Sequence, residues 1–380
     1  MDIKAKLILL ALVPLCLTSC GEKAFADHLD DYVFTMKYHD NFNILQLTDI
    51  HWNYNSSTVA SRAYLDKVFA QVQRHLKEEQ GENAKIDLVE ITGDLFMLAN
   101  TFHVETLVKY MEEKADEYGF LYAAVWGNHD HHGIYNPNWL SNQFKKAPHS
   151  IHIDEDDNLY GRSNFIINLT DDGSKTAATK WQLANLDSGA SFSETAISPF
   201  RDYDYLRKDQ TQWWKMEHDR VGVDVPAIAY YHIPQADNLK AWNAIHYEGA
   251  TYKHKFFKLE GFGDNGNEAY ASDFIKVGRE NNLKGAFMGH AHNVDWTVDY
   301  DGVVIGLGVK TGTELYFAHV DAQSTKPEVQ EGLASVGINE NFDLIGASLV
   351  TLKDTVGNFD LEHLYLNERT SGDFVRWVKW

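Results

Sequence analysis

Residues 121–130 read Leu-Tyr-Ala-Ala-Val-Trp-Gly-Asn-His-Asp, and this stretch decides how the whole chain is interpreted. An apolar run of strand length ends here in an amide, an imidazole and a carboxylate: Asn128, His129 and Asp130. On either side of it, four other apolar runs also end in Asp, His or both. These ends are Asp49-Ile50-His51, Gly93-Asp94, His232 and Gly289-His290-Ala291-His292. Packing alone hardly explains five such strand ends, so we interpret them as one binuclear metal site.

Strands and helices alternate around the first three of these ends. The hydrophobic pattern predicts strands over residues 43–48, 86–92 and 121–126, with amphipathic helices over 58–79 and 104–117. This order predicts a parallel sheet with right-handed crossovers. In such sheets, functional groups gather at the carboxyl ends of the strands, where these acidic and imidazole side chains fall.

The rest of the chain predicts more strands, two helices and three long loops. The expected strands cover residues 164–169, 181–187, 227–231, 285–288, 303–307, 314–319, 347–352 and 359–366, and the helices cover 206–219 and 272–281. The loops cover residues 133–160, 188–204 and 234–271. The last loop has no clear period, and a run of that length usually covers a site or carries function. No linker or repeat follows residue 30, so residues 31–380 are predicted to form a single domain.

The composition limits the kinds of partner. The chain has 380 residues, 44% hydrophobic and 23% charged, which suits a soluble globular protein. Its formal net charge of -21 repels polyanions at long range, so a nucleic-acid partner is disfavoured. A metal site can still hold one phosphate group locally against that field.

The N-terminus predicts export. Lys4 and Lys6 precede an apolar run that is too short to span a bilayer, followed by Leu17-Thr18-Ser19-Cys20. The last four residues resemble the bacterial lipoprotein box, which implies a signal peptide over residues 1–19, a lipidated Cys20 and a tether over 20–30. The protein would then be anchored to a membrane of the cell envelope outside the cytoplasm, in the periplasm or at the cell surface. A plain secretory signal with a chance cysteine is the alternative.

The residue types at the strand ends suit metal ions. Asp49 and His51 are two residues apart, which places their side chains on the same side of an extended chain, and His290 and His292 repeat this spacing. Gly93 permits a sharp turn that frees the Asp94 carboxylate to bridge two cations. Asn128 offers a carbonyl oxygen, which a hard cation accepts.

In this order the motifs resemble those of the calcineurin-like metallophosphoesterases. The family pattern D-x-H, G-D, G-N-H-D, H and G-H-x-H is met in full over about residues 43–295. The resemblance implies an α/β fold, a four-layer α/β/β/α sandwich with two mixed β-sheets. It also implies one metal ion held by Asp49, His51, Asp94 and His292 and a second held by Asp94, Asn128, His232 and His290. His129 would be the substrate-facing imidazole, and Asp130 would orient it.

Several pieces resemble the branch related to purple acid phosphatases. These pieces are Leu186-Asp187-Ser188-Gly189, the helix with Trp213, and His292-Asn293-x-Asp295. One departure matters, because the purple enzymes have a metal-binding tyrosine three residues after the Gly-Asp aspartate, and Met97 stands there. A ferric-tyrosinate centre is therefore disfavoured, and the two divalent ions are expected to be Mn, Fe or Zn.

The expected function is metal-dependent hydrolysis of a small phosphate ester by a metal-bound hydroxide, with His129 protonating the leaving alcohol or stabilising the transition state. The metal ligands do not separate a phosphomonoesterase from a phosphodiesterase, nucleotidase or phospholipid-type diesterase. A non-catalytic lipoprotein that binds metal or ligand is the alternative from another class.

Further residues are candidates for the substrate side of the site. The candidates are His131, His132, Tyr135 and His254, which either line the mouth of the site or belong to the local packing and solvated surface of their loops. Asp187 and Asn293 are candidates for support of the residues around the metals.

Overall fold

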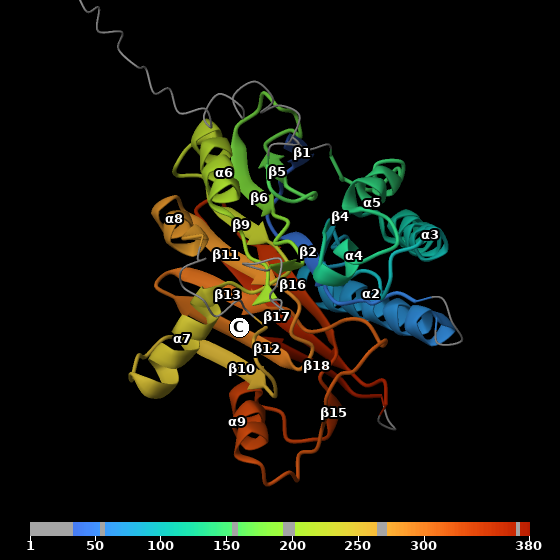
Figure 1. The fold of residues 1–380 in the computed structure, drawn as a ribbon, viewed down its shortest axis with the longest axis vertical. Coiled ribbons are helices and arrows are strands. Elements are labelled where there is room, and N and C mark those ends of the chain that lie inside the picture. Colours follow the sequence, from blue (N-terminus) through green and yellow to red (C-terminus); the bar gives the residue numbers. More distant parts are fainter. Residues whose placement is uncertain (1–32, 54–57, 154–158, 193–201, 264–271, 370–372) are drawn as a thin grey trace, which may run out of the picture.

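The computed structural model describes residues 33–53, 58–153, 159–192, 202–263, 272–369 and 373–380. The predicted signal peptide, the lipidation site Cys20 and the tether lie outside these residues. Two mixed sheets lie face to face in the described part of the chain (Figure 1). None of the described helices is both long enough and apolar enough to cross a membrane.

The first sheet contains the first three motif-bearing strands. Its order is β18-β17-β16-β2-β3-β4, formed by Val375–Lys379, Phe359–Leu366, Gly346–Leu352, Phe42–Leu47, Leu88–Thr92 and Leu121–Val125. The neighbours β2, β3 and β4 are parallel, whereas β16, β17 and β18 are antiparallel. The predicted parallel sheet is therefore one half of a mixed sheet.

The second sheet contains the other two motif-bearing strands. Its order is β1-β5-β6-β9-β11-β13-β12-β10, formed by Val33–Lys37, Phe165–Thr170, Thr179–Asn185, Ala227–Tyr230, Leu283–Met288, Val303–Leu307, Val294–Tyr300 and His254–Lys258. The central strands β6, β9, β11 and β13 are parallel. The ends of β9 and β11 consequently meet at one edge of this sheet.

Helices cover the outer face of each sheet (Figure 1). On the first sheet lie α2, α3 and α5, formed by Thr58–Gln80, Thr101–Tyr118 and Pro137–Phe144. On the second lie α6, α7 and α8, formed by Lys208–Val221, Ala236–Tyr247 and Phe274–Glu280. The four-layer α/β/β/α prediction is confirmed.

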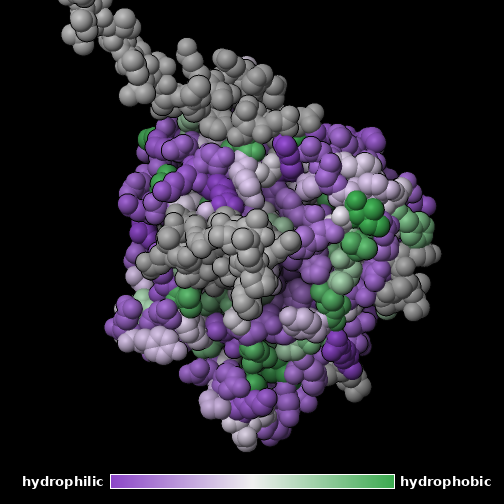
Figure 2. Space-filling view, in the orientation of Figure 1, coloured by the Kyte–Doolittle hydropathy of each residue, from purple (hydrophilic) through white to green (hydrophobic). Residues whose placement is uncertain are grey.

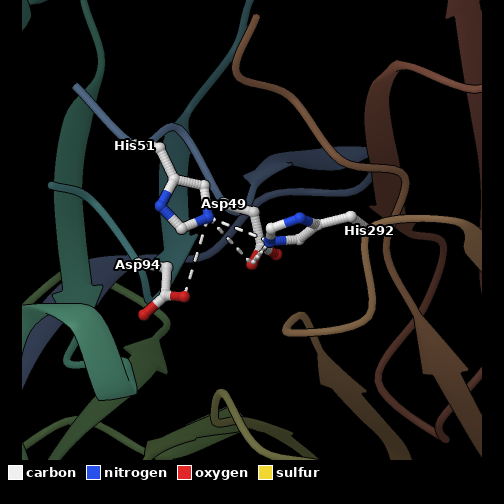
Figure 3. A group of neighbouring side chains, drawn as sticks. All are labelled: Asp49, His51, Asp94 and His292. Carbon is white, nitrogen blue, oxygen red and sulfur yellow. Dashed lines mark hydrogen bonds and ion pairs between the residues drawn. The ribbon is translucent and has the colours of Figure 1, made fainter. Parts of the chain in front are cut away.

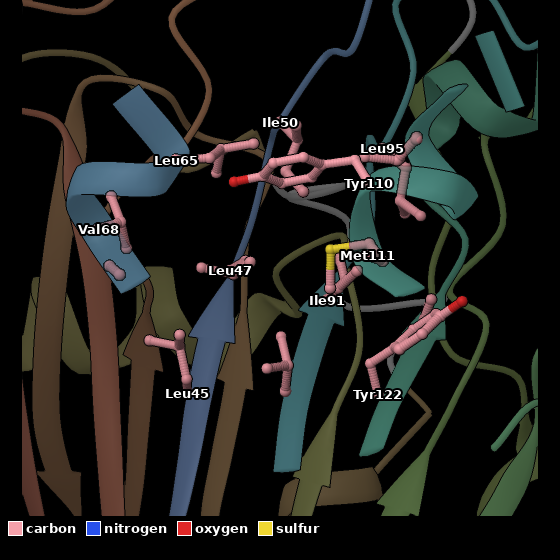
Figure 4. Close-up of a cluster of buried hydrophobic side chains, with 14 of the residues drawn as sticks. Leu45, Leu47, Ile50, Leu65, Val68, Ile91, Leu95, Tyr110, Met111 and Tyr122 are labelled. Atoms are coloured by element: carbon pink, nitrogen blue, oxygen red, sulfur yellow. The ribbon is translucent and has the colours of Figure 1, made fainter. Parts of the chain in front are cut away.

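The alternation of side chains along β2 explains this layering. Leu45 and Leu47 point outward, toward the helices. There they pack in one hydrophobic cluster with Val68 of α2 and Met111 of α3 (Figure 4). Ile44 points to the opposite face and joins residues of the second sheet in the core between the sheets. A strand buried on both faces reads as a continuous apolar run, which is the pattern that predicted it.

Three predictions about local structure were wrong. The expected loop 133–160 contains α5, which begins where Asn136 accepts a hydrogen bond from the Trp139 N–H and Pro137 takes the first helical position. The unperiodic stretch 234–271 contains α7 and β10. The expected strand 314–319 is irregular until β14, His319–Val320, which pairs with β15, Phe342–Asp343.

Other elements of the described part of the chain were not predicted. They are β1, β12, β15, β18, α9 (Pro327–Val336), the one-turn helix α4 (Asn128–His131) and the short pair β7 (Ser191–Phe192) and β8 (Asp202–Tyr203). The face of the molecule seen in Figure 2 is mainly hydrophilic, with small hydrophobic patches, as the high charge predicts.

Candidate metal centre

The structure brings the five motif-bearing strand ends together at one edge of the two sheets. Asp49 and His51 follow β2, Asp94 follows β3, and Asn128 follows β4. His232 follows β9 of the second sheet, and His290 and His292 follow β11. All seven predicted ligands belong to two adjoining groups of donor atoms.

The first group is Asp49, His51, Asp94 and His292, whose donor atoms all lie within 4.8 Å of one another (Figure 3). His51 Nε2 lies 2.9 Å from His292 Nε2 and 3.7 Å from carboxylate oxygens of both Asp49 and Asp94. His292 Nε2 lies 3.3 Å from Asp49 Oδ1. All four residues are buried.

The second group is Asp94, His232 and His290, again within 4.8 Å. His232 Nε2 lies 3.3 Å from Asp94 Oδ1, 3.2 Å from Asn128 Oδ1 and 3.3 Å from His290 Nδ1. Asp94 belongs to both groups, with Oδ2 turned to His51 and Oδ1 to His232. This is the arrangement expected of a carboxylate that bridges two ions.

These distances fit the metal ions that the residues imply. Ligand bonds of about 2 Å place neighbouring donor atoms about 3 Å apart or slightly more, which matches the contacts above. His232 also donates from Nδ1 to the Thr92 carbonyl, 2.8 Å away, so its Nε2 faces Asp94 and Asn128 and would be the atom that binds metal after losing its proton. The donor set of carboxylates, imidazoles and one amide suits divalent transition metals.

The ligands are presented by an unusual backbone. Asp49, His51, Asp94 and His290 have φ angles of 51°, 49°, 50° and 78°, in the left-handed region that residues with side chains rarely adopt. The prediction of an extended chain at Asp49-x-His51 was therefore wrong, although both side chains do reach the same group. Four such residues at one site indicate local strain that the surrounding fold maintains, as is typical of functional sites.

Close packing explains two of the motif glycines. A Cβ atom on Gly93 would lie 2.4 Å from His232 Nδ1, and one on Gly289 would lie 1.9 Å from Thr48 Oγ1. Gly93 also has a φ of 86°. The backbone approaches the ligand side chains so closely that only glycine fits.

Burial and charge set the protonation of the ligands before any ion binds. Burial lowers the pKa of His51 to about 4 and that of His290 to about 3, so both are neutral near pH 7. For His232 burial is outweighed by the Asp94 carboxylate, which raises its pKa to about 9. Despite burial, contacts with His232 hold the pKa of Asp94 far below its usual range. His51, His290 and Asp94 are therefore in the form that binds cations, and His232 must lose a proton.

The expected pairing of Asp130 with His129 was wrong. The Asp130 carboxylate is buried and accepts backbone N–H groups of Gly127, Phe96 and Leu95 at 2.8, 3.1 and 3.2 Å. His129 Nδ1 instead lies 3.2 Å from the Met97 carbonyl, which makes it the donor and leaves Nε2 as the acceptor. The His129 ring packs edge-on against His51, with 4.9 Å between the ring centres. Asp130 thus ties the turns after β3 and β4 together, while Met97 orients His129.

The four substrate-side candidates lie in different places. His131 Nε2 pairs with the buried Asp187 carboxylate at 2.9 Å. The His132 N–H closes α4 on the Asn128 carbonyl. Tyr135 stacks on Trp139, with 4.2 Å between ring centres.

His254 lies in β10, where its ring packs beside Phe256 and Trp296, so its contacts are those of local packing. Asn293, the other supporting candidate, donates to Glu260 from its backbone N–H at 2.9 Å.

One charged residue at the centre was not found by sequence reasoning. Lys310 is 1% exposed, and its ammonium group donates to the Asp49 carbonyl at 2.6 Å. Burial lowers its pKa to about 8. It lies three residues after β13, and a lone lysine there is an ordinary surface signal, so only the fold reveals its position.

Comparisons with known proteins agree with this geometry. The family model described as "Calcineurin-like phosphoesterase" matches residues 42–294, which include all the proposed ligands. Among curated proteins, "Probable inactive purple acid phosphatase 28" of Arabidopsis thaliana is 27% identical over 72% of this chain and 71% of its own length. "Probable inactive purple acid phosphatase 14" of the same plant is 23% identical over 77% of this chain and 75% of its own length.

Solved structures give weaker matches. A dimetal phosphatase from Danio rerio has a TM-score of 0.45 and 12% identity, over 84% of this chain and 98% of that chain. GAP50, described as the anchor in the inner membrane complex of Plasmodium, has a TM-score of 0.49 and 13% identity, over 90% and 89% of the two chains.

Proposed function

Because the chain belongs to the calcineurin-like phosphoesterase family, we propose that it hydrolyses small phosphate esters at a centre of two divalent metal ions. The observation that carries this proposal is the sharing of Asp94 between two groups of buried donor atoms. A single structural metal site would need only one such group, with its positions closed by protein ligands.

The proposed division of labour follows the geometry. Asp49, His51, Asp94 and His292 would hold one ion, and Asp94, Asn128, His232 and His290 would hold the other. Two ions held by these residues would supply an activated water and would neutralise charge on the phosphoryl oxygens. His129 would act from its Nε2, which the Met97 carbonyl leaves without a proton in the resting imidazole.

His129 would therefore take up a proton before it donates one to the leaving alcohol, or it would hydrogen-bond an incoming water. Asp130 would not act directly on the leaving alcohol or on the incoming water. Its carboxylate holds the turn that carries Asn128 and His129.

The ions and the location are also proposals. Met97 occupies the position of the purple enzymes' tyrosine, and the mixed set of imidazole and oxygen ligands supports Mn, Fe(II) or Zn. The lipoprotein-like segment ending at Cys20 supports a membrane anchor outside the cytoplasm. The net charge of -21 supports a small substrate over nucleic acid.

The test is hydrolysis of p-nitrophenyl phosphate and bis-p-nitrophenyl phosphate by the purified mature protein, loaded separately with Mn, Fe(II) and Zn. We expect turnover that depends on two bound ions per chain, and the ratio of the two rates separates a monoesterase from a diesterase. Absence of turnover with every metal, in protein shown to contain two ions, would contradict the proposal. That result would favour the alternative, a non-catalytic protein that binds metal or ligand. Both plant relatives are named inactive.

A further inference from the structure

A sixth strand end carries a carboxylate beside the metal centre. Asp187 lies two residues after β6, and β6 pairs in parallel with β9, whose end carries the proposed ligand His232. The two ends stay together beyond the strands, because the Ile233 N–H donates to Ser188 Oγ at 2.8 Å. Neighbouring strands of a sheet are about 4.8 Å apart. Asp187 therefore lies next to the strand end that supplies the second donor group.

The Asp187 carboxylate is fully buried and firmly held. It accepts the backbone N–H groups of Arg162 and Gly189 at 2.7 and 2.8 Å, and the Asp187 N–H donates to Asn164 Oδ1 at 3.0 Å. His131 Nε2 lies 2.9 and 3.0 Å from the two carboxylate oxygens. Although burial opposes it, His131 and these hydrogen bonds lower the pKa of Asp187, so the carboxylate is ionised.

The pairing occupies Nε2 of His131 and leaves Nδ1 available. In the described part of the chain no group hydrogen-bonds this Nδ1, and the His131 side chain is 18% exposed. Burial is outweighed by the Asp187 carboxylate, which raises the pKa of His131. When the ring is protonated, Nδ1–H is a proton donor whose orientation a buried carboxylate fixes.

The two imidazoles of α4 lie toward different donor groups. His129 and His131 are two residues apart, and residues so spaced do not share a side of a helix. The His129 ring packs against His51 of the first group, whereas His131 reaches Asp187, beside the strand end of the second group. In an in-line displacement the entering water and the leaving alcohol are on opposite sides of phosphorus. One imidazole on each side would serve both.

We propose that His131 is the catalytic acid that protonates the leaving alcohol, that Asp187 is its positioning residue, and that the substrates are esters of alkyl alcohols. This inference rests on the proposed function. An alkoxide is a poor leaving group, so an alkyl ester needs a proton donor, whereas an activated aryl ester does not. His129 is then the imidazole that serves the entering water.

The step balances as follows in atoms and charge. Water enters as hydroxide after one proton has passed to the solvent, and its oxygen bonds to phosphorus. The P–O bond to the alcohol breaks, and its electron pair stays on the alcohol oxygen. That oxygen takes the proton of His131 Nδ1, and the neutral imidazole regains a proton from the solvent.

The substrate test compares p-nitrobenzyl phosphate with p-nitrophenyl phosphate. The two esters have similar shapes, but p-nitrophenolate leaves readily without a proton and the benzyl alkoxide does not. We expect His131→Gln to lower kcat/KM about 100-fold for the benzyl ester and less than about threefold for the phenyl ester. Equal falls for the two esters would overturn the inference alone. If the wild type hydrolyses neither ester with any metal, the proposed function fails and this inference with it.

Variants separate proton donation from support of the fold. Asp187→Asn should move the alkaline fall of kcat/KM for p-nitrobenzyl phosphate to lower pH, because the carboxylate charge no longer favours the imidazolium. Both variants should keep the metal content of the wild type. Loss of metal with equal falls for both esters would mean that the pair only supports the turn carrying Asn128, and the inference would fail. The matched control is His319→Gln, which breaks another pair of a histidine with a buried aspartate, Asp343, and should change neither rate.

A measurement on the metal-free protein does not depend on turnover. An NMR titration follows the imidazole resonance of His131, which is identified by its absence from the His131→Gln variant. We expect its midpoint to fall to lower pH in the Asp187→Asn variant and to stay unchanged in His319→Gln. An equal midpoint in the wild type and Asp187→Asn would mean that the carboxylate does not maintain the proton on His131, and would contradict the inference.

Discussion

Replacement of Glu90 by Gln should make the protein more stable, and increasingly so as the pH rises. Glu90 lies in β3, is fully buried, and shares with Leu88 the face that looks into the core between the sheets. Burial raises its pKa from 4.5 to about 8, and the Asn185 side chain only partly opposes this. A rise of this size corresponds to roughly 5 kcal/mol between the protonated and ionised forms in the folded protein.

The direction follows from proton binding by the two states. Between pH 4.5 and about 8 the folded protein keeps the Glu90 proton, whereas the unfolded chain has released it. The free energy of unfolding therefore falls through this range and levels off above it. Gln resembles the protonated glutamate in shape, so the variant should nearly match the wild type at pH 4.5 and exceed it by several kcal/mol at pH 9.

Urea unfolding of both proteins at pH 4.5, 6, 7.5 and 9, followed by tryptophan fluorescence, measures this difference. Other groups titrate as well, but their contributions cancel when the free energy of unfolding of the wild type is subtracted from that of the variant at each pH. Glu331→Gln, at an exposed position of α9, is the control and should show a difference of less than about 0.5 kcal/mol at every pH. A Glu90→Gln difference that does not grow with pH would refute the reasoning, because it would mean that Glu90 is ionised and compensated in the folded protein.

Three further predictions concern the metal centre. Asp94→Ala should lose both ions, since its carboxylate belongs to both donor groups, and elemental analysis that finds one full equivalent would contradict the bridging role. His129→Ala should keep both ions but lose turnover by about 100-fold, whereas loss of metal would make His129 a ligand. Metal binding at pH 7.5 should release the His232 proton, because its pKa is about 9 in the metal-free protein. Calorimetric titration in two buffers of different ionisation enthalpy detects this proton, and identical heats would contradict the prediction.

The sequence pattern predicted a parallel sheet with the site at its edge, and the family resemblance of the motifs implied the four layers of the fold. Apolar runs of strand length alternate with helical periods up to residue 126, and this order leads to parallel strands whose carboxyl ends share one edge. The grouping of Asp49, Asp94 and Asn128 followed from this topology, whereas the grouping with His232, His290 and His292 was implied by the family resemblance. Glycines such as Gly93 and Gly289 also carried information, since no other residue fits beside the ligands.

The backbone of the ligands and the identity of their neighbours depended on the tertiary structure. Asp49 and His51 have left-handed φ angles because contacts from distant segments hold them there, and neighbouring residues in the sequence carry no sign of this. For the same reason Met97, not Asp130, contacts the His129 imidazole.

Lys310 is the clearest case of what only the fold decided. It lies outside every motif, and in the sequence it looks like an ordinary surface lysine. Spacing along a chain predicts which side chains share a strand or a helix face. It does not predict which loops from different parts of the chain will pack side by side, because that depends on the folded shape of everything between them.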